Sequence, residues 1–354
     1  MLIVDRSAFP RYKTCGGGLL GVSRREVPPE AAHTVTEHIR RAVFTRNRAA
    51  PASLERAAAF LGMTRREEFD AALLDAAVAA DAEFRPGISV RDVEQGSDAV
   101  SLRVTGGSEP VLIARFVIGC DGAGGRMGRH VGVRLGEVDL GLEDEVVTPS
   151  DWSGDPEAVL LDWGEQPGSY GWLFPKGDRL AVGVIARRGS PEETREYLAR
   201  WKDHLGLSGA PTSHSSGHLA QWREAGSPVV SGRVLVAGDT AGLLEPWTRE
   251  GISYALRSGR WAGEAAGAAA RAGSAGSAEL QRYADRVTEG LEPEQRAGAA
   301  VLALFERRPG LVHSLISRPG RAQRFFVRFC AGDASLASVA RRRWLMAAIR
   351  LLSR

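Results

Sequence analysis

The chain has 354 residues, of which 44% are hydrophobic and 25% charged, and this composition is typical of a globular protein rather than a disordered or fibrous one. A net charge of only +3 makes the whole molecule a poor candidate for nucleic-acid binding. Three cysteines, Cys15, Cys120 and Cys330, match neither a metal-ligand spacing nor a disulfide framework, so we expect a reducing, cytoplasmic location. No apolar run approaches the roughly 20 residues that span a bilayer.

In chain order, the hydrophobic pattern predicts a strand, two helices, several strands, an antiparallel middle and a helical end. The predicted ranges are strand 1–4, helices 30–46 and 65–80, strands 89–104 and 111–119, an antiparallel sheet within 139–185, helix 192–204, strand 233–237, helix 252–270 and helices after 279. Strand, loop and helix patterns on both sides of an antiparallel middle predict an α/β fold, α+β overall, with a split domain and an inserted domain. The predicted boundaries are 1–135 with 230–290 for the split domain, 136–229 for the inserted domain and 291–354 for a helical, basic C-terminal region.

The clearest motif follows the apolar strand near residue 235, where the chain continues with Gly238 and Asp239. Ligands of α/β sheets bind at the carboxyl ends of strands, where glycine allows close backbone approach and aspartate accepts hydrogen bonds from sugar hydroxyls. Gly251 and Ile252 then begin a helix whose N-terminal amides can hold an anion. A buried strand followed by an ordinary aspartate turn explains the spacing equally well.

Two weaker features repeat this logic. The apolar run at 116–119 leads into Asp121 and Gly122, although an isolated Asp-Gly pair is usually only a turn. Asp5 ends the first predicted strand, where an acid can hold a ribose hydroxyl, although a lone aspartate there is normally a solvated loop residue. Taken together, the three strand ends predict a nucleotide-type site.

These motifs together resemble the FAD-dependent geranylgeranyl reductase family, within the wider flavin monooxygenase-like group. The resemblance runs from Val4 to about Glu264. The segments that carry it are Phe9-Pro10-Arg11, Cys15-Gly16-Gly17, Arg66-x-x-Phe69-Asp70, Asp121-Gly122, Gly238-Asp239 and Pro167-x-x-Tyr170-x-Trp172-x-Phe174-Pro175. The last of these fits the PxxYxWxFP pattern of the subfamily at every fixed position, and the wider group lacks it.

The resemblance implies a Rossmann-like FAD-binding domain that is incomplete at its N-terminus, an inserted antiparallel-sheet substrate domain and a helical C-terminus. The residues that it implies for FAD are Asp5, Arg6, Cys15, Gly16, Gly17, Arg66, Asp121, Gly122, Gly238, Asp239, Gly242, Gly251 and Ile252. The residues that it implies for an isoprenoid cavity are Tyr170, Trp172, Phe174 and Pro175, which an ordinary strand core also explains. Cys15 is implied to lie near the reactive side of the flavin, as a catalytic thiol that assists proton delivery or as a small packed residue.

The implied activity is that of an FAD-dependent oxidoreductase that saturates isoprenoid C=C bonds by hydride transfer from N5 of reduced FAD, with a proton donor completing the reaction. NAD(P)H and ferredoxin both stay open as the electron donor. Two alternatives also stay open: a flavin-dependent monooxygenase or halogenase that uses the same Asp/Gly motifs, and a truncated, non-catalytic remnant.

Two features depart from the family pattern. Arg249 stands where the family has the glycine of Thr-Gly-Glu-Gly-Ile. No Gly-x-Gly-x-x-Gly precedes the strand that ends here at Asp5, which is where the family has it; the run Gly16 to Gly21 has this spacing but follows that strand. Losing the phosphate contacts of that loop would cost about 5 to 9 kcal/mol of binding energy. We therefore expect either a start codon placed too late, which we favour, or a nonfunctional fragment.

The C-terminal region is strongly basic, with eleven arginines against two acidic residues from Glu306 onward. Apolar residues such as Trp344 and Leu351 are interspersed with arginines such as Arg342 and Arg350. This pattern predicts an interfacial helix on an anionic membrane, or equally an arginine-decorated helix packed on the body of the protein. The expected partners are thus an isoprenoid lipid or polyprenyl substrate and, through this tail, the inner membrane face, with no nucleic acid.

Overall fold

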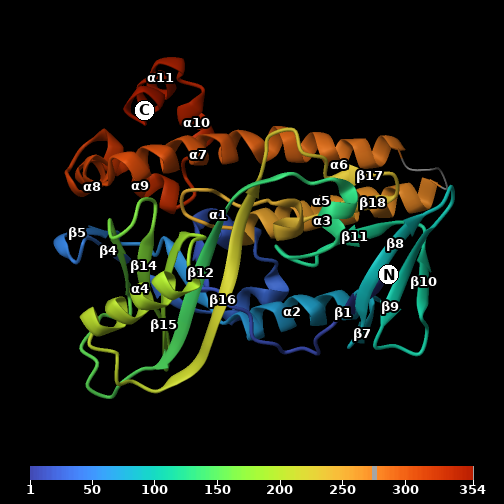
Figure 1. Cartoon of the computed structure of the whole chain (residues 1–354), viewed down its shortest axis with the longest axis horizontal. Helices are drawn as coiled ribbons and strands as arrows, with labels where there is room; N and C mark the ends of the chain where they lie inside the picture. Colours follow the sequence, from blue (N-terminus) through green and yellow to red (C-terminus); the bar gives the residue numbers. More distant parts are fainter. Residues whose placement is uncertain (273–276, 354) are drawn as a thin grey trace. The chain divides into compact units, whose positions relative to one another are not determined.

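The computed structural model describes residues 1–272 and 277–353 (Figure 1). The chain forms two compact units, each assembled from three separate segments. Unit 1 comprises Met1–Arg11, Asp70–Glu137 and Gln221–Arg296, and unit 2 comprises Tyr12–Phe69, Val138–Ala220 and Ala297–Arg354. Four elements carry the chain from one unit to the other: α2 (Arg66–Ala79), β12 (Leu135–Val147), β16 (Thr212–Arg223) and α7 (Glu292–Arg307). Residues 12–69 therefore share a unit with the middle of the chain, and the predicted domain boundaries stay a prediction.

Unit 1 contains three short sheets packed with helices. Its strands are β1 (Leu2–Asp5), β7 (Glu83–Pro86), β8 (Ser89–Gln95), β9 (Val100–Thr105), β10 (Val111–Ala114), β11 (Val117–Gly119), β17 (Val230–Ser231) and β18 (Val234–Val236). β1 pairs in parallel with β7, β8 to β10 form an antiparallel sheet, and β18 lies between β11 and β17. Its helices are α3 (Met127–Val131), η2 (Gly238–Ala241), α5 (Ile252–Ala272) and α6 (Ser277–Gly290).

The core of unit 1 lies where β18 meets α5 and α6. Val234, Leu235 and Val236 are all buried there with aliphatic and alanine side chains of the two helices. The Tyr283 hydroxyl, from α6, donates a hydrogen bond to Val236 O at 2.6 Å, so the one polar atom of this ring is satisfied in an apolar setting. The core thereby fixes the strand that delivers the Gly238-Asp239 motif.

Unit 2 is built on a seven-stranded sheet in the order β16-β12-β15-β14-β13-β4-β5. Its further strands are β4 (Arg41–Arg46), β5 (Ala49–Glu55), β13 (Ala158–Trp163), β14 (Tyr170–Lys176) and β15 (Arg179–Arg187), and a smaller sheet contains β2 (Gly18–Leu20), β6 (Leu61–Thr64) and β3 (Val35–Ile39). Its helices are α1 (Gly21–Glu26), η1 (Pro29–Thr34), α4 (Pro191–His204), α8 (Pro309–Ser317), α9 (Arg321–Cys330), α10 (Leu336–Ala340) and α11 (Arg343–Leu352).

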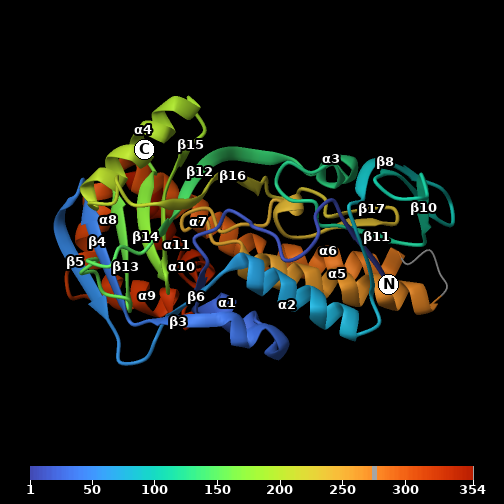
Figure 2. The same ribbon diagram turned by 90° about the horizontal axis from the view of Figure 1, so that it is seen from below.

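Both faces of the seven-stranded sheet are covered. On one face, Leu173 and Val182 pack with Trp201 of α4. On the other face, Trp163 lies 5.7 Å from Phe305 of α7, measured between ring centroids. Figure 2 shows α8 and α9 in the same part of the view as β4, β13 and β14, with α4 near the end of these strands. Because neighbouring residues of a strand point to opposite faces, β14 contributes Leu173 and Pro175 to the first face and Tyr170, Trp172 and Phe174 to the second.

The predicted helix over residues 30–46 is wrong. Only η1 is helical there, and β3 and β4 are strands. β-branched residues such as Val35 and Val43 lose side-chain freedom in a helix and fit a pleated sheet. In β4, Ala42 and Phe44 are buried on alternate positions, which is the period of a strand. The ranges 89–104 and 111–119, each predicted as one strand, hold two strands each, β8 and β9 in the first and β10 and β11 in the second, and the other predicted elements are present.

Within the part of the chain that is described, none of the helices combines the length and the apolar character that crossing a membrane would need.

Candidate functional site

The two Asp/Gly motifs of unit 1 leave the same edge of one sheet. β11 and β18 are parallel neighbours, with Gly119 opposite Val236. Beyond the strands, Ala237 N donates to Gly119 O at 3.1 Å, and Gly122 N donates to the Thr240 hydroxyl at 2.8 Å. The structure therefore brings the loop after each strand into direct contact, as the sequence-based hypothesis requires.

The two aspartates differ in what holds them. Asp121 is exposed and caps α3, because its Oδ2 accepts from Arg126 N at 2.5 Å and Met127 N at 3.2 Å. Asp239 is half-buried within the 3₁₀ turn η2. Gly122 has φ +82°, and a Cβ at this position would meet no atom within 4 Å. The backbone at Gly122 thus borders open space, which fits the close approach of a nucleotide cofactor.

The loop before α5 is organised by a buried carboxylate that the sequence analysis missed. Glu245 accepts hydrogen bonds from Trp247 N at 3.1 Å and Thr248 N at 2.6 Å, and its burial raises its pKa. Arg249 has φ +58°, in the left-handed region that favours glycine. The substitution of arginine for the family's glycine therefore leaves the loop in a glycine-type conformation, at a cost in backbone strain.

Two further predicted FAD contacts open α5. Gly251 precedes the helix and Ile252 is its first residue. The Glu250 carboxylate accepts from Ser253 N at 2.7 Å and from the Ser253 hydroxyl at 2.6 Å. Since this acid occupies the amide of the second helical residue, we expect a ligand to meet the N–H groups of Gly251 and Ile252.

The remaining predicted nucleotide contacts lie elsewhere in the chain. Asp5 ends β1, and its Oδ1 accepts from Ser7 N at 2.8 Å, which closes a local turn next to Arg6. β1 pairs with β7 and belongs to a sheet separate from that of β11 and β18. Arg66 is the first residue of α2 in unit 2. Their contacts with a cofactor stay a prediction.

The Cys-Gly-Gly segment lies on an aromatic face in unit 2. A Cβ on Gly16 would be 2.8 Å from Cδ2 of Phe174, so only glycine can lie this close to the ring. Gly17 has φ +73°, and a Cβ there would be 2.1 Å from Thr64 O. The half-buried Cys15 accepts at Sγ a hydrogen bond from Gly17 N at 3.4 Å. Backbone geometry and close approach together explain both glycines.

Three of the four residues predicted for the substrate share this face. The ring centroids of Tyr170 and Trp172 are 6.1 Å apart, and those of Trp172 and Phe174 are 6.3 Å apart. Pro175 alternates to the opposite face of β14, next to Leu173. The aromatic side chains are therefore a continuous apolar surface under the Cys15–Gly17 segment.

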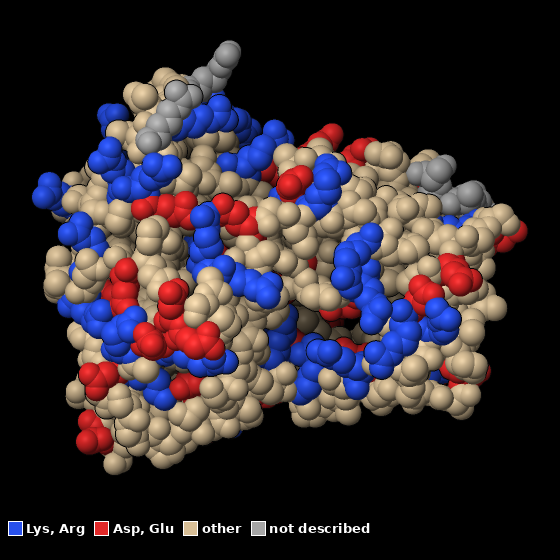
Figure 3. Space-filling view, in the orientation of Figure 1, with Lys and Arg blue, Asp and Glu red and all other residues tan. Residues whose placement is uncertain are grey.

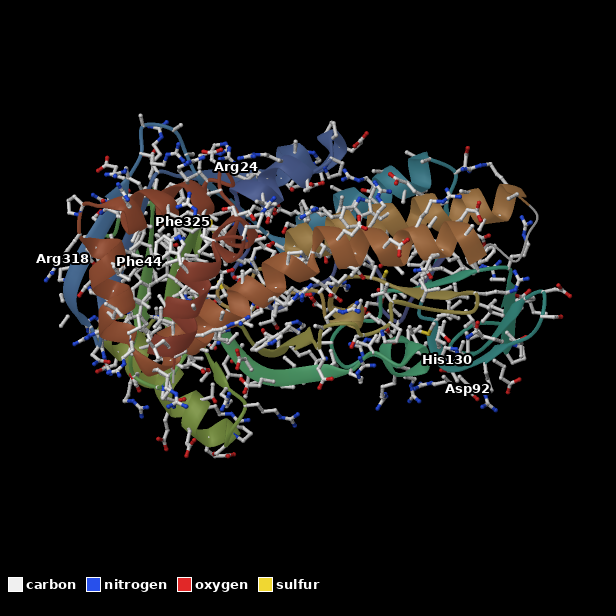
Figure 4. All side chains as sticks on the ribbon, turned by 90° about the horizontal axis from the view of Figure 1, so that it is seen from above. Arg24, Phe44, Asp92, His130, Arg318 and Phe325 are labelled. Atoms are coloured by element: carbon white, nitrogen blue, oxygen red, sulfur yellow. The ribbon has the colours of Figure 1, made fainter. Side chains whose placement is uncertain are left out.

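This aromatic face continues toward the C-terminal helices. Phe44 of β4 lies 5.2 Å from Trp163 and 5.5 Å from Phe326 of α9, between ring centroids. Figure 4 shows Phe44 between the strands and those helices. Rings of this size bury wide apolar area.

A buried charge cluster, absent from the predictions, borders the same face. Lys176 and Glu145 are each 2% exposed and pair at 2.9 Å, and Arg179 Nη1 lies 3.1 Å from the other Glu145 oxygen. Lys176 Nζ also donates to Cys15 O at 2.9 Å. Glu143, two residues before Glu145, is 1% exposed. The run Leu-Glu-Asp-Glu-Val within a strand is the signal that could have revealed these acids.

Comparison with known proteins shows which family this chain belongs to. The model of the FAD binding domain family matches residues 20–289. The chain is 28% identical to a chloroplastic geranylgeranyl diphosphate reductase of Oryza sativa over 294 residues, which cover 77% of this chain and 60% of that protein. The chain thus spans less than two thirds of the length of that relative.

Solved structures share the fold. A geranylgeranyl bacteriochlorophyll reductase-like protein from Thermoplasma acidophilum has a TM-score of 0.83 at 18% identity, covering 99% of this chain and 92% of that one. The flavin-dependent halogenase CmlS has a TM-score of 0.68 at 23% identity, covering 99% of this chain and 67% of that one. At these identities the likeness concerns the fold alone.

The chain belongs to the FAD-binding domain family. Within it, the resemblance to FAD-dependent geranylgeranyl reductases is confirmed, and with it the FAD cofactor, the oxidoreductase class and the predicted mixed α/β fold with a large sheet and a helical C-terminus. The adjacent strand ends, the open backbone at Gly122 and the start of α5 fit such a cofactor.

Proposed function

We propose that this protein reduces C=C bonds of an isoprenoid chain. When bound and reduced, FAD supplies the hydride from its N5 atom. The observation that carries the proposal is the aromatic surface of Tyr170, Trp172 and Phe174 lying under the Cys15–Gly17 segment in unit 2. Large rings bury an apolar chain without offering hydrogen bonds that it cannot use. The relatives named geranylgeranyl diphosphate reductase and digeranylgeranylglycerophospholipid reductase support the same substrate class.

In this proposal the residues of unit 1 bind the cofactor. Asp239 accepts hydrogen bonds from ribityl or sugar hydroxyls, and the amides of Gly251 and Ile252 face the electron-rich part of the nucleotide. The aromatic side chains of unit 2 hold the alkene and exclude water. Cys15 remains the candidate thiol of the site.

The test is anaerobic turnover. Purified full-length protein should be yellow with bound flavin, and after reduction with dithionite it should convert geranylgeranyl diphosphate to products heavier by two hydrogens per bond reduced. Phe174→Ala should raise KM about tenfold, because it removes half-buried contact area on the aromatic face. Trp152→Ala is the control, because Trp152 packs on the α4 face of the same sheet.

The outcome separates the alternatives. Strict dependence on oxygen, with no reduction of the prenyl substrate, would favour a monooxygenase or halogenase. A colourless protein that does not take up added FAD would favour a non-catalytic remnant.

We also propose that the C-terminal helices contact an anionic membrane, where a lipid-linked substrate would reside. Trp344 and Leu351 of α11 are each 70% exposed, and Leu352 is 43% exposed. Arg342 and Arg350 flank them and are exposed. Figure 3 shows Lys and Arg side chains gathered over these helices. Exposed aromatic and aliphatic residues among arginines are typical of helices that lie in a membrane interface.

Vesicle flotation tests this contact. Full-length protein should float with vesicles of phosphatidylglycerol and not with phosphatidylcholine alone, and Trp344→Ser/Leu351→Ser should abolish flotation. A matched change elsewhere, Val111→Ser/Ile113→Ser in exposed β10, should have no effect. Flotation to the same extent with and without phosphatidylglycerol would overturn the proposal.

A further inference from the structure

Glu143 is the most deeply buried acid on the aromatic face. It lies on β12 opposite Gly183, which is itself opposite Trp172, so the Glu143 and Trp172 side chains share one face of the sheet. Trp172 Nε1 donates to Oε2 at 3.3 Å, and Cys15 N donates to Oε1 at 3.2 Å. The carboxyl group thus joins the aromatic surface to the Cys-Gly-Gly segment.

Glu143 and Glu145 sit on the same face but in opposite electrostatic settings. Burial raises the pKa of Glu143, and the charge of Glu145 raises it further, against the lowering effect of Lys176. Burial also raises the pKa of Glu145, but direct pairing with Lys176 and Arg179 outweighs it, and the net pKa is lowered. Two neighbouring carboxyls whose surroundings push their pKa values apart are the usual arrangement of an acid and a permanent anion.

A line of hydroxyl groups leads from Glu143 toward the surface of the sheet. The Tyr12 hydroxyl lies 3.5 Å from Glu143 Oε1 as a donor, and it accepts from the Ser216 hydroxyl at 3.2 Å. Thr14 Oγ1 donates to Ser216 Oγ at 2.8 Å. Burial raises the pKa of Tyr12, which keeps its hydroxyl protonated. Ser216 is half-buried between exposed residues of β16, so the line ends near solvent.

The charged groups that act on Glu143 are Glu145 of β12 and Lys176 of β14, and Tyr12 and Cys15 of the covering segment are hydrogen-bonded to it. Arg179 of β15 and His214 of β16 lie next to Glu145, with Nδ1 of His214 3.9 Å from Glu145 Oε2. The His214 ring stacks on Tyr12 with centroids 4.3 Å apart and planes 3° apart. Lys176 and Arg179 both form ion pairs with Glu145. The nearest positive charges are therefore paired with Glu145 and not with Glu143.

We propose that Glu143 stores the proton that the reduction consumes, and that Ser216 and Tyr12 refill it from the surface of the sheet. This inference rests on the proposed function. The hydride carries two electrons to one alkene carbon, and the other carbon takes the proton of the Glu143 carboxyl group, so one C=C bond is lost, two C–H bonds form and a carboxylate remains. Tyr12 then passes its hydroxyl proton to Glu143 Oε1 and receives one from Ser216, which takes one from solvent in the same step, so all three groups return to the starting state.

Infrared spectroscopy tests the stored proton without any substrate. Glu143→Gln is made in the Trp172→Phe background, since the glutamine Nε2 cannot accept the hydrogen bond that Trp172 donates. The difference spectrum between Trp172→Phe and Trp172→Phe/Glu143→Gln at pH 7 should show loss of a protonated carboxyl band. Loss of a carboxylate band instead would mean that Glu143 is ionised, and it would overturn the proposal.

Rapid mixing tests the use of that proton. With dithionite-reduced protein and geranylgeranyl diphosphate, the flavin of the double variant should reoxidise about 100-fold more slowly than that of Trp172→Phe, while its reoxidation by oxygen is unchanged. The Trp172→Phe rate should fall as the pH rises through the pKa of Glu143, because only the protonated acid can donate, and the double variant should lose this dependence. Rates within threefold of each other would overturn the proposal.

Tyr12→Phe keeps the stacked ring and tests the refilling step. Its first turnover should keep a rate within threefold of the wild type, whereas its steady-state rate should fall at least about tenfold. An unchanged steady state would overturn the relay, even if Glu143→Gln proves too unstable to study. If wild type reduces no prenyl substrate at all, the proposed function fails, and the infrared result still decides whether Glu143 holds a proton.

Discussion

The candidate sites of the two units are built from different materials. In unit 1, the strand ends of β11 and β18 are joined mainly through backbone groups, as in the bond from Ala237 N to Gly119 O. In unit 2, the aromatic face is bordered by buried charged side chains, among them Lys176 and Glu145. A site made from backbone at strand ends follows from local sequence, whereas a site made from side chains across a sheet depends on strand register. Each kind should therefore respond differently to substitution.

The largest effect is expected from the charge pair of unit 2. Lys176→Met would leave Glu145, which is 2% exposed, without its closest cation, and removing one partner of a buried pair costs about 3 to 5 kcal/mol. Urea denaturation should show a loss of unfolding free energy in this range. Arg195→Ala is the control, because its pair with Glu192 lies at the exposed start of α4 and should contribute nothing measurable. A loss no larger than that of the control would mean that the Lys176–Glu145 pair does not stabilise unit 2.

Gly17→Ala should have the next largest effect. A Cβ there would lie 2.1 Å from Thr64 O, in addition to the strain of φ +73°, so we expect a loss of about 2 to 4 kcal/mol in unfolding free energy. Gly206→Ala separates the two causes, because Gly206 has φ +69° with open space around it. That control should lose only about 1 kcal/mol. Equal losses in the two variants would mean that close packing on Thr64 is unimportant.

Sequence patterns predicted the unit 1 site better than the unit 2 site. Asp121 and Asp239 were predicted to share a sheet edge because each follows an apolar strand, and the parallel pairing of those strands bears this out. The strands β3 and β4 were predicted as a helix, although β4 pairs with β13, more than 100 positions away, and β3 pairs with β6 in a separate sheet, and neither pairing can be read from the local pattern. Glu143 was missed for the same reason, since its neighbours Cys15 and Trp172 come from distant segments.

A smaller effect is expected from the link between the two motif loops of unit 1. Thr240→Val removes the hydroxyl that accepts from Gly122 N at 2.8 Å and leaves that amide without this partner. The loss should be about 1 to 2 kcal/mol in stability, together with weaker FAD binding by isothermal titration. Thr240→Ser retains the acceptor and should bind FAD like the wild type. If valine and serine behave alike, the two loops are not coupled through this bond.

The smallest effect is expected from a substitution of Arg249. It tests whether the backbone strain at this residue affects cofactor binding in unit 1. Arg249→Gly should raise the midpoint of thermal unfolding and stabilise the fold by about 1 kcal/mol, because glycine adopts φ +58° without the clash of a Cβ. Asp81→Gly is the matched control, since Asp81 has φ +65° at the exposed end of α2 and should gain a similar amount. Only Arg249→Gly should also change the FAD dissociation constant, because its loop leads directly into Gly251 and α5. Equal FAD affinity in both variants would mean that Arg249 strains the loop without touching the cofactor site, and the arginine would then need an explanation outside cofactor binding.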